Sequence, residues 1–158
     1  MYYSKFTAEP LQFTVFADEE GIFSLFINDS PKIPAGFIEL PIEDKHFYDI
    51  SEQMAEYLKG RRKVFNAKTH LKGTEFQVQV WNALKEIPYG ETVSYKTLAI
   101  QIGNEKAVRA VGGANKLNPL PIIVPCHRVI QADGSLGGYA CGIKVKRMLL
   151  DLEKAKTV

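Results

Sequence analysis

The front of the chain alternates between apolar and polar positions in two short runs. Residues 11–17 and 22–27 are rich in aromatic and β-branched side chains, and the polar stretch 18–21 separates them. This pattern predicts a β-hairpin. Apolar side chains then recur every three or four residues over about 43–58, which predicts an amphipathic helix that stops at Gly60. We therefore expect a small domain with antiparallel strands followed by a helix.

The pattern becomes polar and irregular over residues 62–73, which suggests a linker. Thr74 can then cap a new helix, whose apolar stripe is formed by Phe76, Val80, Leu84 and Ile87. A Pro-Tyr-Gly stretch stops this helix directly after Ile87. A second domain, mainly helical, is therefore expected after the linker.

Two short helical segments follow, over residues 95–102 and from 105 to about 116, and a Gly-Asn turn joins them. Ser94 and Asn104 are suitable caps for their first turns. Two short helices with a tight turn fit a helix-turn-helix, which would bind DNA. An ordinary helical hairpin fits the pattern equally well, so spacing alone leaves both open.

The second of these helices has an unusual composition. It places one cation, Arg109, among small residues that include the adjacent pair Gly112-Gly113. Each glycine inside a helix costs about 1 kcal/mol relative to alanine, so such a pair suggests that another backbone approaches closely. That partner is either a neighbouring helix or a groove of a nucleic acid.

The chemical centre is expected around Cys126. Residues 122–124 are apolar and predict a short buried strand that leads into Pro125-Cys126-His127-Arg128-Val129. A thiol has a pKa of about 8.5, so a nucleophilic cysteine needs a base or a positive charge nearby, and the next two residues are candidates. Neighbours on a strand point to opposite faces, so His127 would need a turn or a water to reach the sulfur. A buried structural cysteine beside a packed histidine remains the alternative.

Composition narrows the setting of this chemistry. Of the 158 residues, 46% are hydrophobic and 24% charged, which is typical of a soluble globular protein. No run approaches the roughly 20 apolar residues that span a bilayer, and the first residues do not resemble a signal peptide. We expect a cytoplasmic protein, nuclear in a eukaryote, with no membrane partner. The two cysteines should be thiols in a reducing cell, and no histidine pairs with them at zinc-finger spacing, so no metal is expected.

Charge is distributed unevenly between the two halves. Residues 1–73 hold 9 Lys and Arg against 11 Asp and Glu, whereas residues 74–158 hold 11 against 7. The back half is therefore net positive, which favours contact with a polyanion.

The motif around Cys126 resembles the active-site signature of the methylated-DNA–protein-cysteine methyltransferases, also called O6-alkylguanine-DNA alkyltransferases. The resemblance extends upstream through 109–114 and Asn118-Pro119, and downstream through Gly138-Tyr139 and a helix from Lys144 to Glu153. It is specific over about 74–153, whereas the front of the chain matches only in length and in element order.

The resemblance implies that Cys126 attacks the alkyl carbon of an O6-alkylguanine, and by extension an O4-alkylthymine, after the base has rotated out of the duplex. His127 would take the thiol proton through a water, and Glu153 would orient and charge that histidine. Glu153 has a hint of its own, because a carboxylate in the last helical turn is disfavoured unless a cation accompanies it; a solvated glutamate is the alternative. Asn118 would brace the turn, and Tyr95 would crowd the target phosphate and protonate the departing guanine.

The same resemblance implies a DNA-binding helix in the minor groove. Arg109 would enter the base stack and fill the gap left by the rotated base. The small residues beside it would contact the duplex: Ala110, Gly112, Gly113 and Ala114. The substrate pocket would be walled by residues that follow the helix in sequence, namely Pro121, Val129, Tyr139, Ala140, Cys141 and Lys146. Cys141 replaces the glycine common in this family, so we hypothesise that it narrows the pocket for large alkyl groups.

The resemblance also implies the fold and the assembly. The fold class is α+β, with a small ribonuclease-H-like α/β domain over 1–68 and a mainly helical, winged helix-turn-helix-like domain over 69–158. We expect a monomer that acts once per molecule on double-stranded DNA and needs no cofactor. Three other functions remain open from the residues alone: a non-catalytic binder of alkylated DNA, a Cys-His hydrolase, and a DNA-binding regulator.

Overall fold

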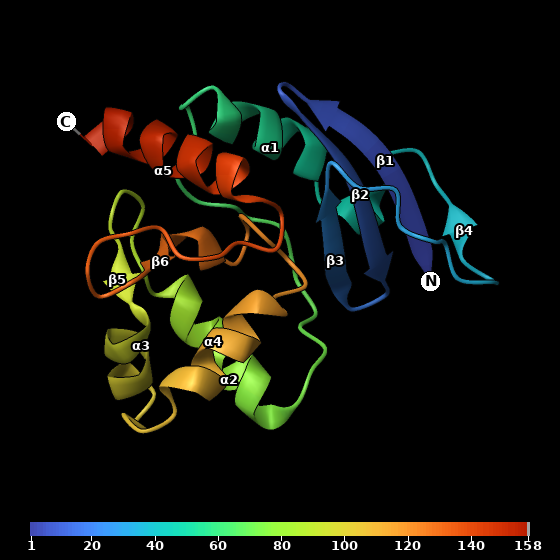
Figure 1. The fold of residues 1–158 in the computed structure, drawn as a ribbon. Coiled ribbons are helices and arrows are strands. Elements are labelled where there is room, and N and C mark those ends of the chain that lie inside the picture. Colours follow the sequence, from blue (N-terminus) through green and yellow to red (C-terminus); the bar gives the residue numbers. More distant parts are fainter. Residues whose placement is uncertain (158) are drawn as a thin grey trace. The chain divides into compact units, whose positions relative to one another are not determined.

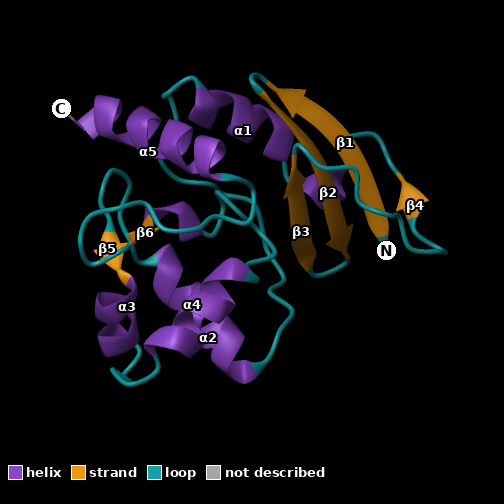
Figure 2. Cartoon of the chain, viewed as in Figure 1, coloured by secondary structure: helices purple, strands orange, loops and turns teal. Residues whose placement is uncertain are grey.

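The computed structural model describes the backbone of residues 1–157 and the side chains of residues 1–154. The chain forms two compact units, Met1–Lys72 and Gly73–Val158 (Figure 1). Most strand residues belong to the first unit and most helical residues to the second (Figure 2). The expected α+β class is therefore confirmed. Among the described residues, no helix combines the length and apolarity that crossing a membrane requires.

The first unit is built on a four-stranded sheet in the order β3-β2-β1-β4. The predicted hairpin is confirmed as β2 (Leu11–Asp18) and β3 (Gly21–Ile27), which pair antiparallel. β1 (Tyr2–Ala8) pairs antiparallel with β2, and the two-residue β4 (Ile38–Glu39) pairs parallel with β1. The sequence pattern had not predicted β1 or β4. In β2 both faces are largely buried, so this strand forms the centre of the unit's core.

The helix predicted over 43–58 is wrong in its first part. A 3-10 helix occupies Lys45–Phe47, and α1 begins only at Ile50 and ends at Leu58. Tyr48 and Asp49 separate the two, because both adopt left-handed backbone conformations with φ of 50° and 56°. A left-handed residue cannot continue a right-handed helix, so the periodic apolar positions are divided between two elements.

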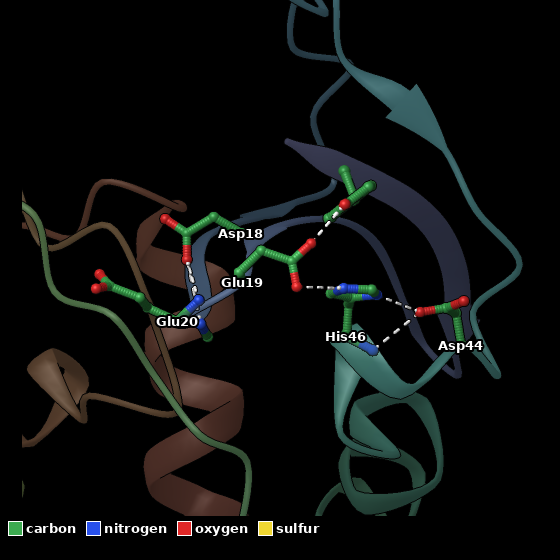
Figure 3. A network of polar contacts seen from close by, with 7 residues as sticks. Asp18, Glu19, Glu20, Asp44 and His46 are labelled. Atoms are coloured by element: carbon green, nitrogen blue, oxygen red, sulfur yellow. Dashed lines mark hydrogen bonds and ion pairs between the residues drawn. The ribbon is translucent and has the colours of Figure 1, made fainter.

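A polar network joins the β2–β3 turn to the start of this 3-10 helix (Figure 3). His46 lies between two carboxylates, with Nδ1 2.6 Å from Asp44 Oδ1 and Nε2 3.1 Å from Glu19 Oε2. The hydrogen bond with Asp44, followed by that with Glu19, raises the pKa of His46. Because the pKa of His46 is higher in the folded than in the unfolded protein, its protonation stabilises the fold. This contribution is present in full below about pH 6.5, the ordinary pKa of histidine, and is lost as the pH rises through the folded-state pKa.

In its described residues, the second unit contains four α-helices, a 3-10 helix and a short pair of strands. Its helices are α2 (Glu75–Lys85), α3 (Tyr95–Gln101), α4 (Val108–Lys116) and α5 (Ile143–Thr157). β5 (Val93–Ser94) and β6 (Val129–Ile130) pair in parallel. Trp81 on α2 is buried, and its Nε1 donates a hydrogen bond of 2.8 Å to the carbonyl oxygen of Ala114 on α4. This bond fixes the packing of α4 against α2.

Two of the three predicted helix caps are confirmed. Thr74 forms a capping box with Gln77, because each side chain accepts a hydrogen bond from the other residue's backbone N–H. Ser94 Oγ accepts a bond of 3.0 Å from the N–H of Thr97. The predicted cap at Asn104 is wrong: residues 104–107 form a turn, in which the Ala107 N–H donates to the Asn104 carbonyl at 3.0 Å, and α4 starts at Val108.

Candidate active site

Cys126 lies at the start of a 3-10 helix, Cys126–Arg128, that follows a tight loop. The strand predicted over 122–124 is wrong. Ile122 has a φ of 74°, and Val124 N–H donates back to Leu120 O at 2.8 Å. A β-branched residue in the left-handed region costs about 1–3 kcal/mol, so surrounding contacts must hold this loop in place.

Asn118 supplies such contacts. Its Nδ2 donates to the carbonyl oxygen of Val124 at 2.8 Å, and its Oδ1 accepts from Leu120 N–H at 3.0 Å. The amide thus spans the loop on both sides of the strained Ile122. A hydrogen bond from Asn118 also acts to lower the pKa of Cys126. The expected bracing role of Asn118 therefore has a direct geometric basis.

The Cys126 side chain borders a cavity of about 370 Å³, large enough for a small organic group. The lining comes from α3, α4, the loop before Cys126 and the loop before α5: Tyr95, Gly112, Asn115, Lys116, Asn118, Pro121, Cys126, Gly138, Tyr139, Ala140 and Cys141. Besides Cys126, seven of the residues predicted for the site, its pocket or the DNA-binding helix thus line this cavity, and they come from elements distant in sequence. Val129 and Lys146 were also expected to line the pocket, but they are fully buried and do not border it.

The thiol of Cys126 is only 5% exposed. Burial raises its pKa, more than the nearby hydrogen bonds and the positive charge of Lys146 lower it. The resting side chain at neutral pH is therefore the neutral thiol, since even an unperturbed cysteine titrates at about 8.5. A reaction through sulfur then requires a base to accept this proton.

His127, the residue after Cys126, forms a buried pair with Glu153. His127 Nε2 lies 2.6 Å from Glu153 Oε2, and the two residues are 0% and 1% exposed. Burial lowers the pKa of His127, whereas hydrogen bonds from His127 and Arg128 hold the pKa of Glu153 at about 2 despite its burial. A neutral imidazole beside a carboxylate must donate through Nε2, which leaves Nδ1 unprotonated. This Nδ1 is buried and has no hydrogen-bond partner among the described protein atoms, so it is available to accept a proton.

Arg128 supplies the cation that sequence reasoning expected beside Glu153. Its Nε and Nη2 donate to the two carboxylate oxygens at 2.8 and 3.0 Å, and its Nη1 donates to Ile87 O at 2.7 Å. The expected position of Glu153 in the last helical turn was wrong, because α5 continues to Thr157. The hydrogen bonds from His127 and from the fork of Arg128, rather than the helix end, therefore keep Glu153 ionised.

The second helix of the candidate helix-turn-helix presents its small residues outward. Arg109, Ala110 and Gly113 are exposed, whereas Ala114 is buried against α2. A Cβ added at Gly113 would meet no atom within 4 Å, and one at Gly112 would meet only Tyr95 Cδ1, at 3.9 Å. The glycine pair is therefore not required by packing within the described chain. The sequence suggested that either a neighbouring helix or a nucleic-acid groove approaches the glycine pair. No described helix approaches Gly113, so the nucleic-acid groove remains for this residue.

Tyr95 begins α3 and faces the cavity beside Cys126. Burial, followed by the charge of Cys126, raises its pKa, so the phenol retains its proton at neutral pH and can donate it.

Comparison with known proteins decides the family. Residues 75–155 match the family model "6-O-methylguanine DNA methyltransferase, DNA binding domain". A methylated-DNA–protein-cysteine methyltransferase of Methanosarcina acetivorans is 48% identical over 156 residues, covering 97% of this chain and 98% of that protein. This chain belongs to the methylated-DNA–protein-cysteine methyltransferase family. The constitutive methylated-DNA–protein-cysteine methyltransferase of Bacillus subtilis is 44% identical over 159 residues, covering 97% of this chain and 95% of that protein.

Solved structures agree with this membership of the methyltransferase family. The crystal structure of Mycobacterium tuberculosis OGT in complex with DNA matches with a TM-score of 0.90 and 40% identity, covering 99% of this chain and 94% of that one. The match spans both units, so the family resemblance, which the sequence motifs carried only from about Thr74, extends to the front of the chain.

Several residues of this methyltransferase site were not predicted from sequence. Asn115, Lys116 and Gly138 line the cavity, and Arg128 donates to the carboxylate of Glu153. The spacing of Asn115 on α4 offered a signal, since it lies three residues after Gly112 and thus on the same helical face. Arg128 offered none beyond its place in the motif, because its partner lies 25 residues away.

Among the described side chains of this methyltransferase, one group could hold a metal ion, and it lies in the first unit. The ligand atoms of Asp18, Glu20 and His70 are within 4.8 Å of one another. In the structure these side chains already contact one another or a lysine: His70 contacts both carboxylates at 2.9 Å, and Lys72 Nζ lies 2.8 Å from Asp18 Oδ2. We therefore assign no chemistry to this cluster.

Proposed function

We propose that this protein repairs DNA by transferring the alkyl group of O6-alkylguanine, and by extension of O4-alkylthymine, to its own Cys126. The observation that carries the proposal is the placement of a cavity-facing thiol beside a neutral, buried imidazole that is hydrogen-bonded to an ionised carboxylate. Membership of the methyltransferase family supports the same reaction.

The reaction can be written with all bonds and protons balanced. His127 Nδ1 accepts the Cys126 proton, through one water, and the resulting imidazolium is stabilised by Glu153. The sulfur then forms a bond to the alkyl carbon while the carbon–O6 bond breaks and its electron pair leaves with guanine. Tyr95 supplies a proton to the departing base and regains one from the imidazolium through solvent. The thioether has no leaving group, so each molecule acts once.

We propose that α3 and α4 form the helix-turn-helix of a winged domain, with α4 in the minor groove. The exposed Arg109, Ala110 and Gly113 would contact the duplex, and Arg109 would occupy the place of the rotated base. The cavity lies at the inner side of α4, where Gly112 and Asn115 form part of its lining. A base rotated past α4 would therefore enter the cavity toward Cys126. The protein would act as a monomer, and the front unit would be ribonuclease-H-like.

Two alternative functions predict different outcomes. A non-catalytic binder of alkylated DNA would need no nucleophile in the cavity, whereas Cys126 lies at its edge. A Cys-His hydrolase would turn over repeatedly. The test is to incubate the protein with excess duplex DNA that carries tritiated O6-methylguanine and to count the label bound to protein. We expect a limit of one methyl per chain, mapped by mass spectrometry to Cys126. Continued release of methylated product, or no label on the protein, would refute the proposal.

The role of Arg109 can be separated from chemistry by comparing two substrates. Arg109→Ala should slow repair of duplex DNA by about tenfold or more, since holding a base out of the stack requires a few kcal/mol. Reaction with free O6-benzylguanine should be unchanged, because no base then needs to be displaced. Lys106→Ala, which removes an exposed cation just before α4, is the control for charge alone. Equal losses on both substrates would contradict the displacement role.

The half-buried Cys141 borders the cavity, and its side chain should limit the size of the alkyl group. Cys141→Gly should raise the rate of benzyl transfer relative to methyl transfer by about tenfold, the effect expected for relieving a few atoms of crowding in a pocket. The measurement is the ratio of the two single-turnover rates on matched DNA. An unchanged ratio would show that this position does not set specificity.

A further inference from the structure

Lys146 is the most completely buried cation in the part of the chain whose side chains are described. It lies in the first turn of α5 and is 0% exposed. An ammonium group removed from water is strongly disfavoured unless all of its protons are hydrogen-bonded. Here the Nζ donates to the carbonyl oxygens of Val129 at 2.7 Å and Gly138 at 3.2 Å, and also to that of Leu136. Its three N–H groups thus match three carbonyl acceptors.

These three carbonyls belong to the two segments that form the site. Val129 directly follows the Cys126–Arg128 turn, in β6. Leu136 and Gly138 belong to the loop that leads into the cavity wall at Tyr139, Ala140 and Cys141. One side chain from α5 therefore ties the segment that carries the nucleophile to the loop that faces it.

The loop needs such a tie because its own sequence favours flexibility. Gly134, Gly137 and Gly142 all have positive φ, and the backbone hydrogen bonds of the loop include short-range ones such as Gly134 N–H to Gln131 O at 3.0 Å. Local turns fix the path of the chain over a few residues but do not fix its distance from Cys126. The bonds to Lys146 do, since α5 is a regular helix.

The charge of Lys146 also acts on the nucleophile. Its attraction for the thiolate lowers the pKa of Cys126 against the effect of burial, and the thiolate in turn raises the pKa of Lys146, which burial lowers. Other groups interact with the same sulfur: Asn118 and Tyr139 by hydrogen bonds, and Tyr95 from α3 by charge. His127, the next residue in sequence, belongs to a buried set with Glu153 and Arg128. Arg128 is neutralised by the carboxylate of Glu153, whereas the hydrogen bonds of Lys146 go to backbone carbonyls.

We propose that Lys146 is a positioning residue of the alkyl-transfer site, which fixes the cavity wall opposite Cys126 through three carbonyls and stabilises the thiolate by its charge. This inference rests on the function proposed above. Lys146 would not touch the substrate in this arrangement, because it is fully buried and does not line the cavity.

The test is the pH dependence of Cys126 alkylation by iodoacetamide, followed by mass spectrometry of the Cys126 peptide. Lys146→Met should move the midpoint upward by roughly one pH unit, the size of shift that a nearby opposite charge produces, and slow alkylation at pH 7.5 about tenfold. Lys144→Met, an exposed position on the same helix, should leave the midpoint unchanged. Lys146→Arg keeps the charge, so its midpoint should stay close to that of the natural chain. An unchanged midpoint in Lys146→Met would overturn the electrostatic role.

A second measurement does not depend on the stability of the Lys146 variants. In protein with ¹⁵N-labelled lysine, the buried ammonium of Lys146 can be titrated by NMR in the natural chain and in Cys126→Ala. Because the interaction is reciprocal, removal of the thiolate should lower the pKa of Lys146. Identical titrations would refute the coupling.

Neither measurement uses alkylated DNA, so the inference and the proposed function fail separately. If the midpoints shift but no methyl is transferred, the function is wrong and the coupling stands. If methyl is transferred but no midpoint shifts, the role of Lys146 is wrong. In methyl transfer itself, the deficit of Lys146→Met should shrink as the pH rises, whereas a purely structural defect would be equal at every pH.

Discussion

Cys126→Ser should take up no methyl from alkylated DNA, while its affinity for the same DNA stays within about twofold of the natural chain. Serine fills nearly the same volume, but its hydroxyl is far less acidic than a thiol and is a poor nucleophile without strong activation. The exposed face of α4 that is proposed to bind the duplex does not include the sulfur, so DNA affinity should not depend on the sulfur. Tritium counting on the protein and a fluorescence-anisotropy titration measure the two properties.

The serine variant also separates the competing functions. Label retained by Cys126→Ser would place the acceptor elsewhere, and Cys141, which borders the same cavity, would be the first candidate. Loss of both binding and transfer would show instead that the loop around Cys126 collapses without its thiol. Circular dichroism of the variant distinguishes this collapse from a chemical effect.

Glu153→Gln should both destabilise the protein and slow methyl transfer. The amide keeps the size of the side chain but removes the charge that Arg128 and His127 share. Breaking a buried ion pair by removing one partner typically costs 3–5 kcal/mol, because the remaining charge is left uncompensated. Transfer should fall by about 100-fold, within the range supplied by general-base catalysis, because the imidazolium loses its counter-ion. Urea unfolding and single-turnover kinetics measure the two effects.

The sign of the pH dependence follows from the pKa of Glu153, which is held at about 2 against an ordinary value of 4.5. The stabilisation is present in full above 4.5 and is lost as the pH falls toward 2. The difference in stability between the natural chain and Glu153→Gln should therefore be largest near neutral pH and shrink in acid. Asp151→Asn, at an exposed position of the same helix, is the control and should change stability by less than about 0.5 kcal/mol. A difference that persists unchanged to pH 2 would contradict this account.

Local patterns predicted those features that depend on neighbours in sequence. Alternation, periodicity and capping residues predicted the hairpin of β2 and β3, the helix caps at Thr74 and Ser94, and the short helices of the second unit. These predictions succeed because each depends on interactions over only a few residues. The family motif added the proposal that Cys126 is the nucleophile and His127 its base.

The predictions from sequence fail where backbone torsions or contacts between distant residues determine the local structure. Residues 122–124 are apolar like a strand, but Pro121 and Pro125 flank them, and the left-handed Ile122 turns the chain into a loop. The fork of Arg128 on Glu153 joins positions 25 residues apart, and the bond from Lys146 to Val129 joins positions 17 apart. No periodicity records such contacts, so the charge state of the site had to come from the structure.

The single tryptophan of the chain offers a natural optical signal. Trp81 is 2% exposed, and its indole N–H is bonded to the main chain of α4, the helix whose outer face carries Arg109 and Gly113. A small shift of α4 against α2 would change the length of this bond and with it the electronic environment of the indole. Intrinsic fluorescence should therefore report engagement of the duplex without any attached dye, and the emission of one residue can be interpreted without correction for others.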